Sequence, residues 1–259
     1  MIDKTSPSAA HAVADIGDGS SIAVGGFGLS GNPSELIDAL LDSGVKNLAI
    51  VSNNCGTDDL GLGVLLAAKR ISKVTASYVG ENKEFERQYL SGELELILTP
   101  QGTLAEKLRA GGAGIPAFFT RTGVGTLVAE GGLPQRYASD GSVLQASEAK
   151  EVRSFEFRGV EHEYVLEEAL TTDFSLVHAA VGDTHGNLIF NKAAGQFSVP
   201  AAMAGRICIA QVEQLVPAGT LDPAQIHLPG VFVHRIVDVA GMHPKPIEKL
   251  TVRADEEGH

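Results

Sequence analysis

The chain has 259 residues, 44% of them hydrophobic, so it is long enough to bury the core of one large α/β domain. Its 20 basic and 32 acidic residues give a formal net charge of -12, which argues against a surface that binds nucleic acid or anionic membranes. Two cysteines far apart, Cys55 and Cys208, indicate neither a disulfide framework nor a zinc site. The first residues lack a targeting signal and no apolar run reaches about 18 residues. We therefore expect a cytoplasmic protein.

The first predicted element is a short helix over residues 9–16, where apolar residues recur at helical spacing. A strand over 21–25 follows, and a glycine-rich loop then leads into a helix over 33–43. In that loop Asn32 can cap the helix and Pro33 can open it. Because glycines let a ligand approach the main chain and the first amides of a helix are unpaired, this loop is a candidate site for an anionic or carbonyl oxygen.

Residues 26–31 of this loop also spell G-x-G-x-x-G, a pattern found in dinucleotide-binding proteins. Such proteins need an acidic residue about 20 residues further on, at the end of the next strand. The next apolar run ends instead in Ser52-Asn53-Asn54-Cys55-Gly56, and the first acid comes late in the loop. A dinucleotide-dependent oxidoreductase is therefore a distant alternative, which tight binding of NADH would support.

Strands and helices then alternate along the first half of the chain. Strands are expected near 21–25, 47–52, 72–77, 94–98 and 116–120, with helices near 33–43, 60–69, 83–91 and 102–110. This alternation predicts an α/β fold of three layers, in which a mainly parallel sheet has helices on both faces. Ligands of such sheets bind at the carboxyl ends of the strands. That rule selects the loops at 25–33, 52–59, 78–82 and 99–102.

The pattern changes to short alternating runs in the second half, which predict a smaller antiparallel hairpin or lid over about 135–170. Further strands are expected at 175–181, 188–190, 206–216 and 231–237, with a hairpin turn at 185–187. The acidic end, about 252–259, is expected to be disordered. We interpret residues 1–259 as one domain with a lid-like insertion.

The selected loops contain neutral amide side chains, Asn53, Asn54 and Gln101, which can donate hydrogen bonds to a carboxylate or a carbonyl. Asx and glycine residues also simply form turns, so that second interpretation stays open. Glu81 is the most plausible catalytic carboxylate, but acids are common in the first turn of a helix, and we interpret it as solvated. Cys55 is interpreted as a small buried hydrophobe. The residues alone thus indicate a pocket with donors and no convincing nucleophile.

The stretch from Asp18 to Pro33 resembles the signature of the family I coenzyme A transferases and fits that pattern at every constrained position. The similarity continues through residues 51–56, 77–82, 98–106 and 109–118 and reaches 186–188 and 231–235. It therefore covers nearly the whole chain. Within the family, the similarity is to the A subunits of enzymes that act on 3-oxoacids.

This resemblance implies a reaction and a partner. The implied reaction moves CoA between an acyl-CoA, expected to be succinyl-CoA, and a 3-oxoacid such as acetoacetate. In the family, the nucleophile is a glutamate of the B subunit, which lies within a Ser-Glu-Asn-Gly motif and carries CoA as a glutamyl thioester. The counterpart here is Ser52-Asn53-Asn54, with Asn53 at the nucleophile's position. Because an amide cannot replace a carboxylate nucleophile, we expect no catalytic residue in this chain and an A2B2 assembly with the B subunit.

The resemblance also implies the residues of a carboxylate-substrate pocket at the subunit interface. They are Asn53, Asn54 and Gln101, with Gly26, Phe27 and Gly28 in its wall. CoA enters as a substrate, and neither a permanently bound cofactor nor a metal is expected.

Several residues depart from the family's usual sequence, so the resemblance does not determine which acyl group is transferred. These are Ser30, Asn32 and residues 195–198. A transferase for 3-oxoadipate or for short-chain fatty acids is therefore one alternative. A non-catalytic ligand-sensing protein on the same fold is another.

Overall fold

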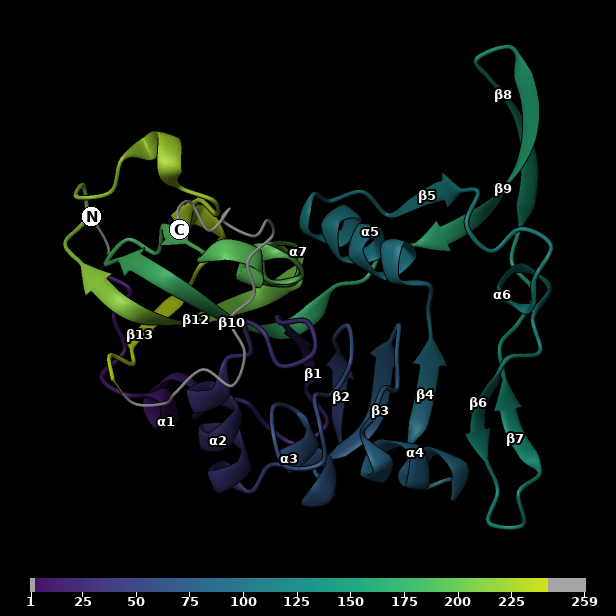
Figure 1. Ribbon diagram of the computed structural model, residues 1–259, viewed down its shortest axis with the longest axis horizontal. Coiled ribbons are helices and arrows are strands. Elements are labelled where there is room, and N and C mark those ends of the chain that lie inside the picture. The colour runs from purple at the N-terminus through teal and green to yellow at the C-terminus, as the bar shows by residue number, and fades with distance from the viewer. Residues whose placement is uncertain (1–2, 242–259) are drawn as a thin grey trace, which may run out of the picture.

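The computed structural model describes residues 3–241, and its centre is one large sheet (Figure 1). The strands of this sheet are β1 (Ser21–Val24), β2 (Leu48–Val51), β3 (Ile71–Ala76), β4 (Glu95–Leu98), β10 (Thr172–Asp183), β11 (Leu188–Ile189), β12 (Gly205–Val216) and β13 (Arg235–Asp238). Their order is β13-β12-β10-β1-β2-β3-β4, with β11 beside β10. Every pair along this path is parallel, and β11 is antiparallel to β10. The mainly parallel sheet predicted from the sequence is confirmed.

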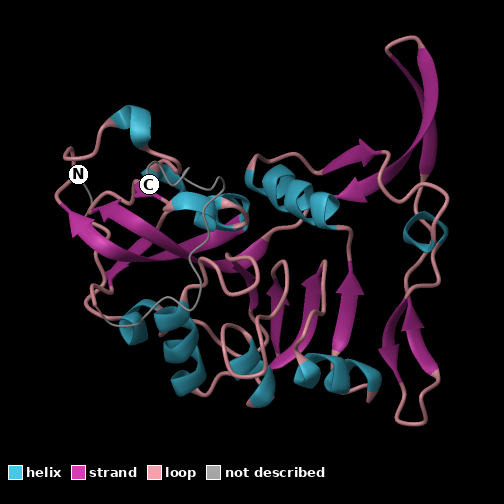
Figure 2. Cartoon of the chain, in the orientation of Figure 1, coloured by secondary structure: helices cyan, strands magenta, loops and turns pink. Residues whose placement is uncertain are grey.

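Helices cover both faces of this sheet (Figure 2). One layer holds α1 (Ala9–Ala12), α2 (Ser34–Ser43), α3 (Gly63–Ala67) and α4 (Lys83–Leu90); the other holds α5 (Gln101–Gly112) and α7 (Ser198–Ala204). Successive strand residues point to opposite faces, so Ile22 and Val24 pack in the first layer and Ala23 in the second. Burial on both sides explains why these strands are apolar throughout.

The connections between β11 and β13 contain three short 3-10 helices. They are η1 (Lys192–Gly195), η2 (Pro223–Gln225) and η3 (Gly230–Phe232). The predicted strand over 231–237 is wrong in its first half, since η3 occupies it and β13 begins only at Arg235. The main-chain N–H groups of Phe232 and Val233 donate to the carbonyls of Pro229 and Gly230 at 3.2 and 3.0 Å, so they are not available to a neighbouring strand.

The fifth predicted strand, β5 (Ala117–Thr120), exists but does not belong to the parallel sheet. It pairs antiparallel with β9 (Val160–Glu168), which in turn pairs with β8 (Val152–Phe157). All four β5 residues are only partly buried, so this strand lacks the two covered faces that a central parallel strand needs. The position beside β1 is taken by β10.

The antiparallel region predicted over about 135–170 consists of two hairpins. A two-stranded sheet of β6 (Pro134–Tyr137) and β7 (Val143–Ala146) follows the short helix α6 (Leu127–Glu130), and the β8–β9 hairpin comes after it. Both hairpins stand at one side of the molecule, and β8–β9 projects away from the body (Figure 1). The extent of a single domain and a lid-like role stay predictions, and the expected disordered tail lies outside the described residues.

A buried ion cluster attaches this antiparallel region to the body. The side chain of Glu167 on β9 is 1% exposed and contacts Lys107 Nζ on α5 at 2.9 Å and Lys150 Nζ at 2.5 Å. A carboxylate is costly to bury without a counter-charge, and the two lysines, which are 15% and 30% exposed, supply it. The Glu167 carboxylate thus joins two chain segments. On the other side, Tyr89 of α4 donates a hydrogen bond to the Pro134 carbonyl at 2.8 Å.

Replacing Glu167 with Gln should lower the free energy of unfolding by about 2–4 kcal/mol, because the two lysines lose their shared counter-charge. Urea unfolding followed by circular dichroism measures the change. The matched control is Glu168→Gln at the exposed neighbouring position, which should leave the midpoint almost unchanged. Equal midpoints for the two variants would show that the cluster does not stabilise the fold.

Candidate functional site

The loops after β1, β2 and β4 meet at the carboxyl edge of the sheet, as predicted. A chain of hydrogen bonds joins them. Gln101 Nε2 donates to Asn53 Oδ1 at 3.2 Å, Asn53 Nδ2 donates to Asn54 Oδ1 at 3.2 Å, and the main-chain N–H of Gly28 donates to the same Asn54 oxygen at 2.9 Å. The structure thus brings together four of the six residues named from the sequence.

Asn53 is the centre of this arrangement. Its side chain is buried, with 2% of the residue exposed, and Ser77 Oγ also donates to its Oδ1 at 2.7 Å. The main chain is fixed as well, because Ser77 N–H donates to the Asn53 carbonyl at 3.0 Å. Buried amides need such partners, and these bonds hold the Asn53 side chain in one orientation.

The helix that carries Gln101 adds a favourable electrostatic environment. Helix α5 begins at Gln101, after Pro100, without any side-chain cap. Its positive end and its first main-chain N–H groups therefore lie beside the amide side chains. This end of α5 favours an anionic oxygen.

The glycine loop is held in shape by its own residues. Gly26 has φ of 109°, and an added Cβ would lie 1.9 Å from Asn32 Oδ1. Phe27 and Ser30 exchange two main-chain hydrogen bonds of 3.0 Å. Phe27, the fifth predicted residue, is 45% exposed at the rim, with its ring centroid 6.4 Å from that of Phe197. Gly26 shapes the loop through its conformation and takes no part in the amide chain.

The predicted role of Asn32 as a helix cap is wrong. Its Nδ2 donates to the Gly28 carbonyl at 3.1 Å, and Pro33 occupies the N-cap position of α2 without a side-chain bond. The cap comes from a distant strand, because Gln211 Oε1 accepts from the Leu36 N–H at 3.1 Å. The Asn32 side chain forms its hydrogen bond within its own loop and does not reach the first N–H groups of α2.

Gln211 belongs to a polar group that the sequence interpretation missed. Its Nε2 lies 2.9 Å from His178 Nδ1, and His178 Nε2 lies 2.7 Å from Glu213 Oε1. Gln211 and His178 are neighbours on β12 and β10. A glutamine inside the apolar run of β12 was the available signal, since polar side chains in a buried strand are uncommon.

Two candidate reactive residues lie outside this arrangement. Glu81 is exposed and precedes Asn82, which caps α4 by accepting from the Phe85 N–H at 2.8 Å. Cys55 is fully buried, and that burial raises the pKa of its thiol to about 12. A thiol that stays protonated is a poor nucleophile, so the interpretation of Cys55 as a buried hydrophobe is confirmed.

Two of the segments that depart from the family pattern are in contact. Gln196 Nε2 donates to the Ser30 carbonyl at 3.2 Å. Gly31 also lies against residue 194, where an added Cβ would be 3.1 Å from the Ala194 Cβ. The glycine loop and the 194–197 segment therefore form one continuous wall next to the amide chain.

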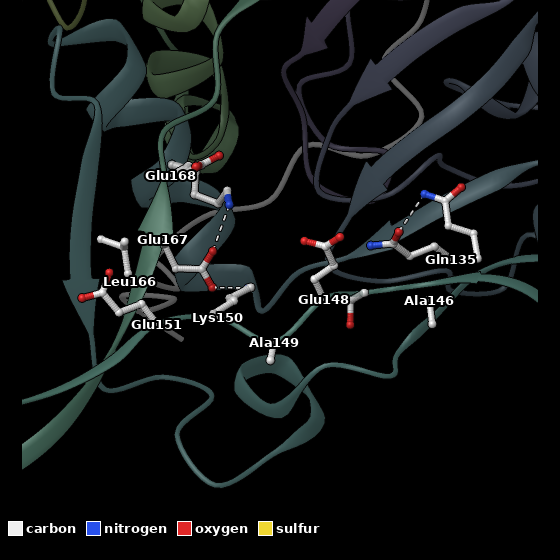
Figure 3. A pocket seen from close by; sticks show the side chains of 12 residues that line it. Gln135, Ala146, Glu148, Ala149, Lys150, Glu151, Leu166, Glu167 and Glu168 are labelled. Carbon is white, nitrogen blue, oxygen red and sulfur yellow. Dashed lines mark hydrogen bonds and ion pairs between the residues drawn. The ribbon is translucent and has the colours of Figure 1, made fainter.

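A polar cavity of about 560 Å³ lies elsewhere, between α5 and the antiparallel region (Figure 3). Its lining includes Glu167 with Lys107 and Lys150, together with Glu148 and Glu168. None of the residues predicted for the substrate pocket is among those that line it. The cavity is the space around the ion cluster that attaches the antiparallel region. In the described part of the chain, no helix combines the length and apolar character needed to cross a membrane.

Comparison with known proteins identifies the family. A model of the coenzyme A transferase family matches residues 7–239. The chain is 62% identical over 252 residues to the A subunit of a probable succinyl-CoA:3-ketoacid coenzyme A transferase of Mycobacterium tuberculosis H37Rv, covering 97% of this chain and 100% of that one. It is 52% identical over 243 residues to the A subunit of the succinyl-CoA:3-ketoacid coenzyme A transferase of Helicobacter pylori J99, covering 94% and 95% of the two chains.

Among solved structures, the fold is similar to an acyl-CoA transferase from Escherichia coli O157:H7 in its apoenzyme form. The TM-score is 0.72 at 25% identity, and the match covers 91% of this chain and 47% of that one, so this chain spans about half its length. The family model and the two relatives, which are matched almost from end to end, show that this chain belongs to the coenzyme A transferase family and is of the A-subunit kind.

Proposed function

We propose that this chain is the A subunit of an enzyme that moves CoA between succinyl-CoA and a 3-oxoacid such as acetoacetate. The observation that carries the proposal is the chain of neutral amides at the carboxyl edge of the sheet, which contains donors and no carboxylate. The names of the relatives support the choice of substrates. A cytoplasmic location, in keeping with bacterial relatives, is part of the same proposal.

The amide side chains have hydrogen atoms left for a substrate carboxylate. The bonds within the amide chain use one hydrogen of Asn53 Nδ2 and one of Gln101 Nε2, and each nitrogen carries a second. Asn54 Nδ2 adds a further pair of donors. Together with the positive end of α5, these groups suit a carboxylate better than any cation.

The nucleophile then comes from the other subunit of the enzyme. In the proposed reaction a B-subunit glutamate attacks the acyl-CoA carbonyl, giving an acyl-glutamyl anhydride and CoA thiolate. The thiolate attacks the glutamyl carbonyl of the anhydride, which releases the first acid and leaves a glutamyl-CoA thioester. The acceptor carboxylate attacks that thioester and the same two steps run in reverse. In this scheme Asn53, Asn54 and Gln101 position the carboxylates and transfer no proton.

The wall made by the glycine loop and residues 194–197 is proposed to select the acyl group. It presents the half-exposed ring of Phe27, which lies 6.4 Å from that of the buried Phe197, and Gln196 joins the two segments by donating to the Ser30 carbonyl. Such a wall would select acyl groups by size, while the amide side chains bind the carboxylate that all the acceptors share. Assays with acetoacetate, 3-oxoadipate and short-chain fatty acids as acceptors separate the alternatives.

CoA exchange between succinyl-CoA and acetoacetate should require both subunits. We expect no exchange with this chain alone and exchange after co-expression with the B subunit, together with a borohydride-sensitive thioester on that second chain. The exchange rate and mass spectrometry of borohydride-treated subunits measure the two effects. Full activity of this chain alone would contradict the proposal and make Glu81 the first residue to replace.

Gln101→Ala should raise the KM for the carboxylate acceptor about fivefold, since one hydrogen bond is worth about 1 kcal/mol. The subunit composition, measured by gel filtration with light scattering, should not change. Gln225→Ala, at an exposed position away from the site, is the control. An unchanged KM would remove Gln101 from the pocket.

Asn53→Asp should weaken acceptor binding more strongly, by at least about tenfold in KM, because it places a carboxylate against the Asn54 oxygen and against the bound acid. Steady-state kinetics with acetoacetate measure this effect. Asn47→Asp makes the same charge change at an exposed position and should leave the KM as it is. Equal constants for both variants would exclude Asn53 from carboxylate binding.

A further inference from the structure

Strand β8 is an open edge of the three-stranded sheet β5-β9-β8. Among residues 3–241 its one strand partner is β9, and all six of its residues are exposed. The hairpin projects from the body, so no other described element covers this edge (Figure 1). Proteins usually protect such edges with Pro, a bulge or charged side chains. β8 contains no Pro and no bulge, and its only charged residues, Arg153 and Glu156, leave three of its six positions to Val152, Phe155 and Phe157.

The two faces of the hairpin differ in chemistry. One face carries Phe155 and Phe157 of β8 beside Tyr164 of β9, with ring centroids of Phe155 and Tyr164 5.6 Å apart. Phe155 and Phe157 are 40% and 57% exposed. Arg153 lies on the same face, with its guanidinium 5.5 Å from the centroid of Phe119 and paired with the exposed carboxylate of Glu151. The opposite face carries Ser154 with Glu156, Glu161 and Glu163.

The hairpin turn determines which groups of β8 point outward. Arg158 and Gly159 have φ of 56° and 75°, as in a two-residue type I′ turn. Such a turn closes on a hydrogen-bonded pair, here Phe157 and Val160. Because the direction of the main-chain groups alternates along a strand, the N–H and C=O groups of Val152, Ser154 and Glu156 point away from β9. These are the groups available to another strand.

We propose that this edge pairs with β8 of a second copy of the chain, antiparallel across a two-fold axis at Ser154. In that register Ser154 is opposite Ser154 of the other copy, and Val152 is opposite Glu156, so all three outward-facing residues are paired. Arg153 then lies opposite the exposed Phe155 of the other copy in a non-hydrogen-bonded pair, where side chains are closest. A cation over an aromatic ring is attractive, and the pair occurs twice.

Other registers of the same two-fold pairing are less favourable. A shift by one residue in each copy toward the N-terminus places Arg153 opposite Arg153, and a shift two residues toward the C-terminus places Glu156 opposite Glu156. Like charges directly opposite each other are destabilising. The register centred on Phe155 loses the pairing of Val152, whose partner would be Arg158 in the turn. Among the registers centred on residues 153 to 156, the one centred on Ser154 pairs all three outward-facing residues and places no like charges opposite each other. This self-complementarity favours a second copy over an unrelated partner.

Disulfide trapping tests the pairing in the full chain alone and in its complex with the B subunit. Ser154→Cys should give a disulfide-linked dimer of this chain on a non-reducing gel, because the two Cα atoms would be about 5.5 Å apart. Glu163→Cys is the matched control, as the residue pairs with Ser154 on the same face of β9 but would be about 15 Å from its copy. Cys55 and Cys208 are buried and do not interfere.

A second pair of variants tests the same edge without oxidation. Ser154→Pro removes an outward N–H and should halve the number of copies of this chain per particle in light scattering, whereas Ser154→Ala should not. CoA exchange by reduced Ser154→Cys enzyme shows that the fold is intact and separates this inference from the proposed function. Absence of the disulfide between two copies, equal trapping at both positions, or a disulfide from Ser154→Cys to the B subunit would overturn the inference.

Discussion

The hydrogen bonds around the buried Asn53 side chain are the interaction on which the proposed site depends. They join the ends of three parallel strands, because Ser77 follows β3, Asn53 follows β2 and Gln101 follows β4. Without these bonds, the loop after each strand could adopt several conformations. A buried amide that needs partners on all sides selects one arrangement of the three loops. The side chains that we propose to bind the substrate are therefore oriented before any ligand is present.

Burial on both faces of the sheet explains why the polar residues gather where they do. The buried residues of β1 alternate between two apolar layers, and such strands leave little place for polar groups along their length. His178 and Gln211 are polar side chains buried within two of these strands, and each needs a partner there. His178 bonds to Glu213, Gln211 bonds to the α2 main chain, and the two bond to each other. The carboxyl edge is where unpaired donors remain available.

Much of the fold and part of the site followed from the sequence, for physical reasons that can be stated. The parallel strands, their helices and the meeting of Asn53, Asn54 and Gln101 follow from apolar runs with polar loops at one edge. The sequence did not predict which sheet contains β5, because a short apolar run has the same pattern in a parallel and in an antiparallel sheet. The partner of Asn32 depends on the folded conformation of its loop. The partner of Gln211 depends on a contact between segments 175 residues apart, since Gln211 bonds to Leu36. No local pattern encodes such contacts. The roles of the site residues stay predictions.

The attachment of the antiparallel region by Glu167 also has a mechanical consequence. Gln101 and Lys107 belong to the same helix, α5, and six residues of helix extend about 9 Å. A helix of this length is stiff, so its two ends do not move independently. Through the contact between Lys107 and Glu167 of β9, the β8–β9 hairpin is connected to the helix whose first residue, Gln101, belongs to the amide chain. We therefore expect a displacement of the β8–β9 hairpin relative to the body to move α5, and Gln101 with it.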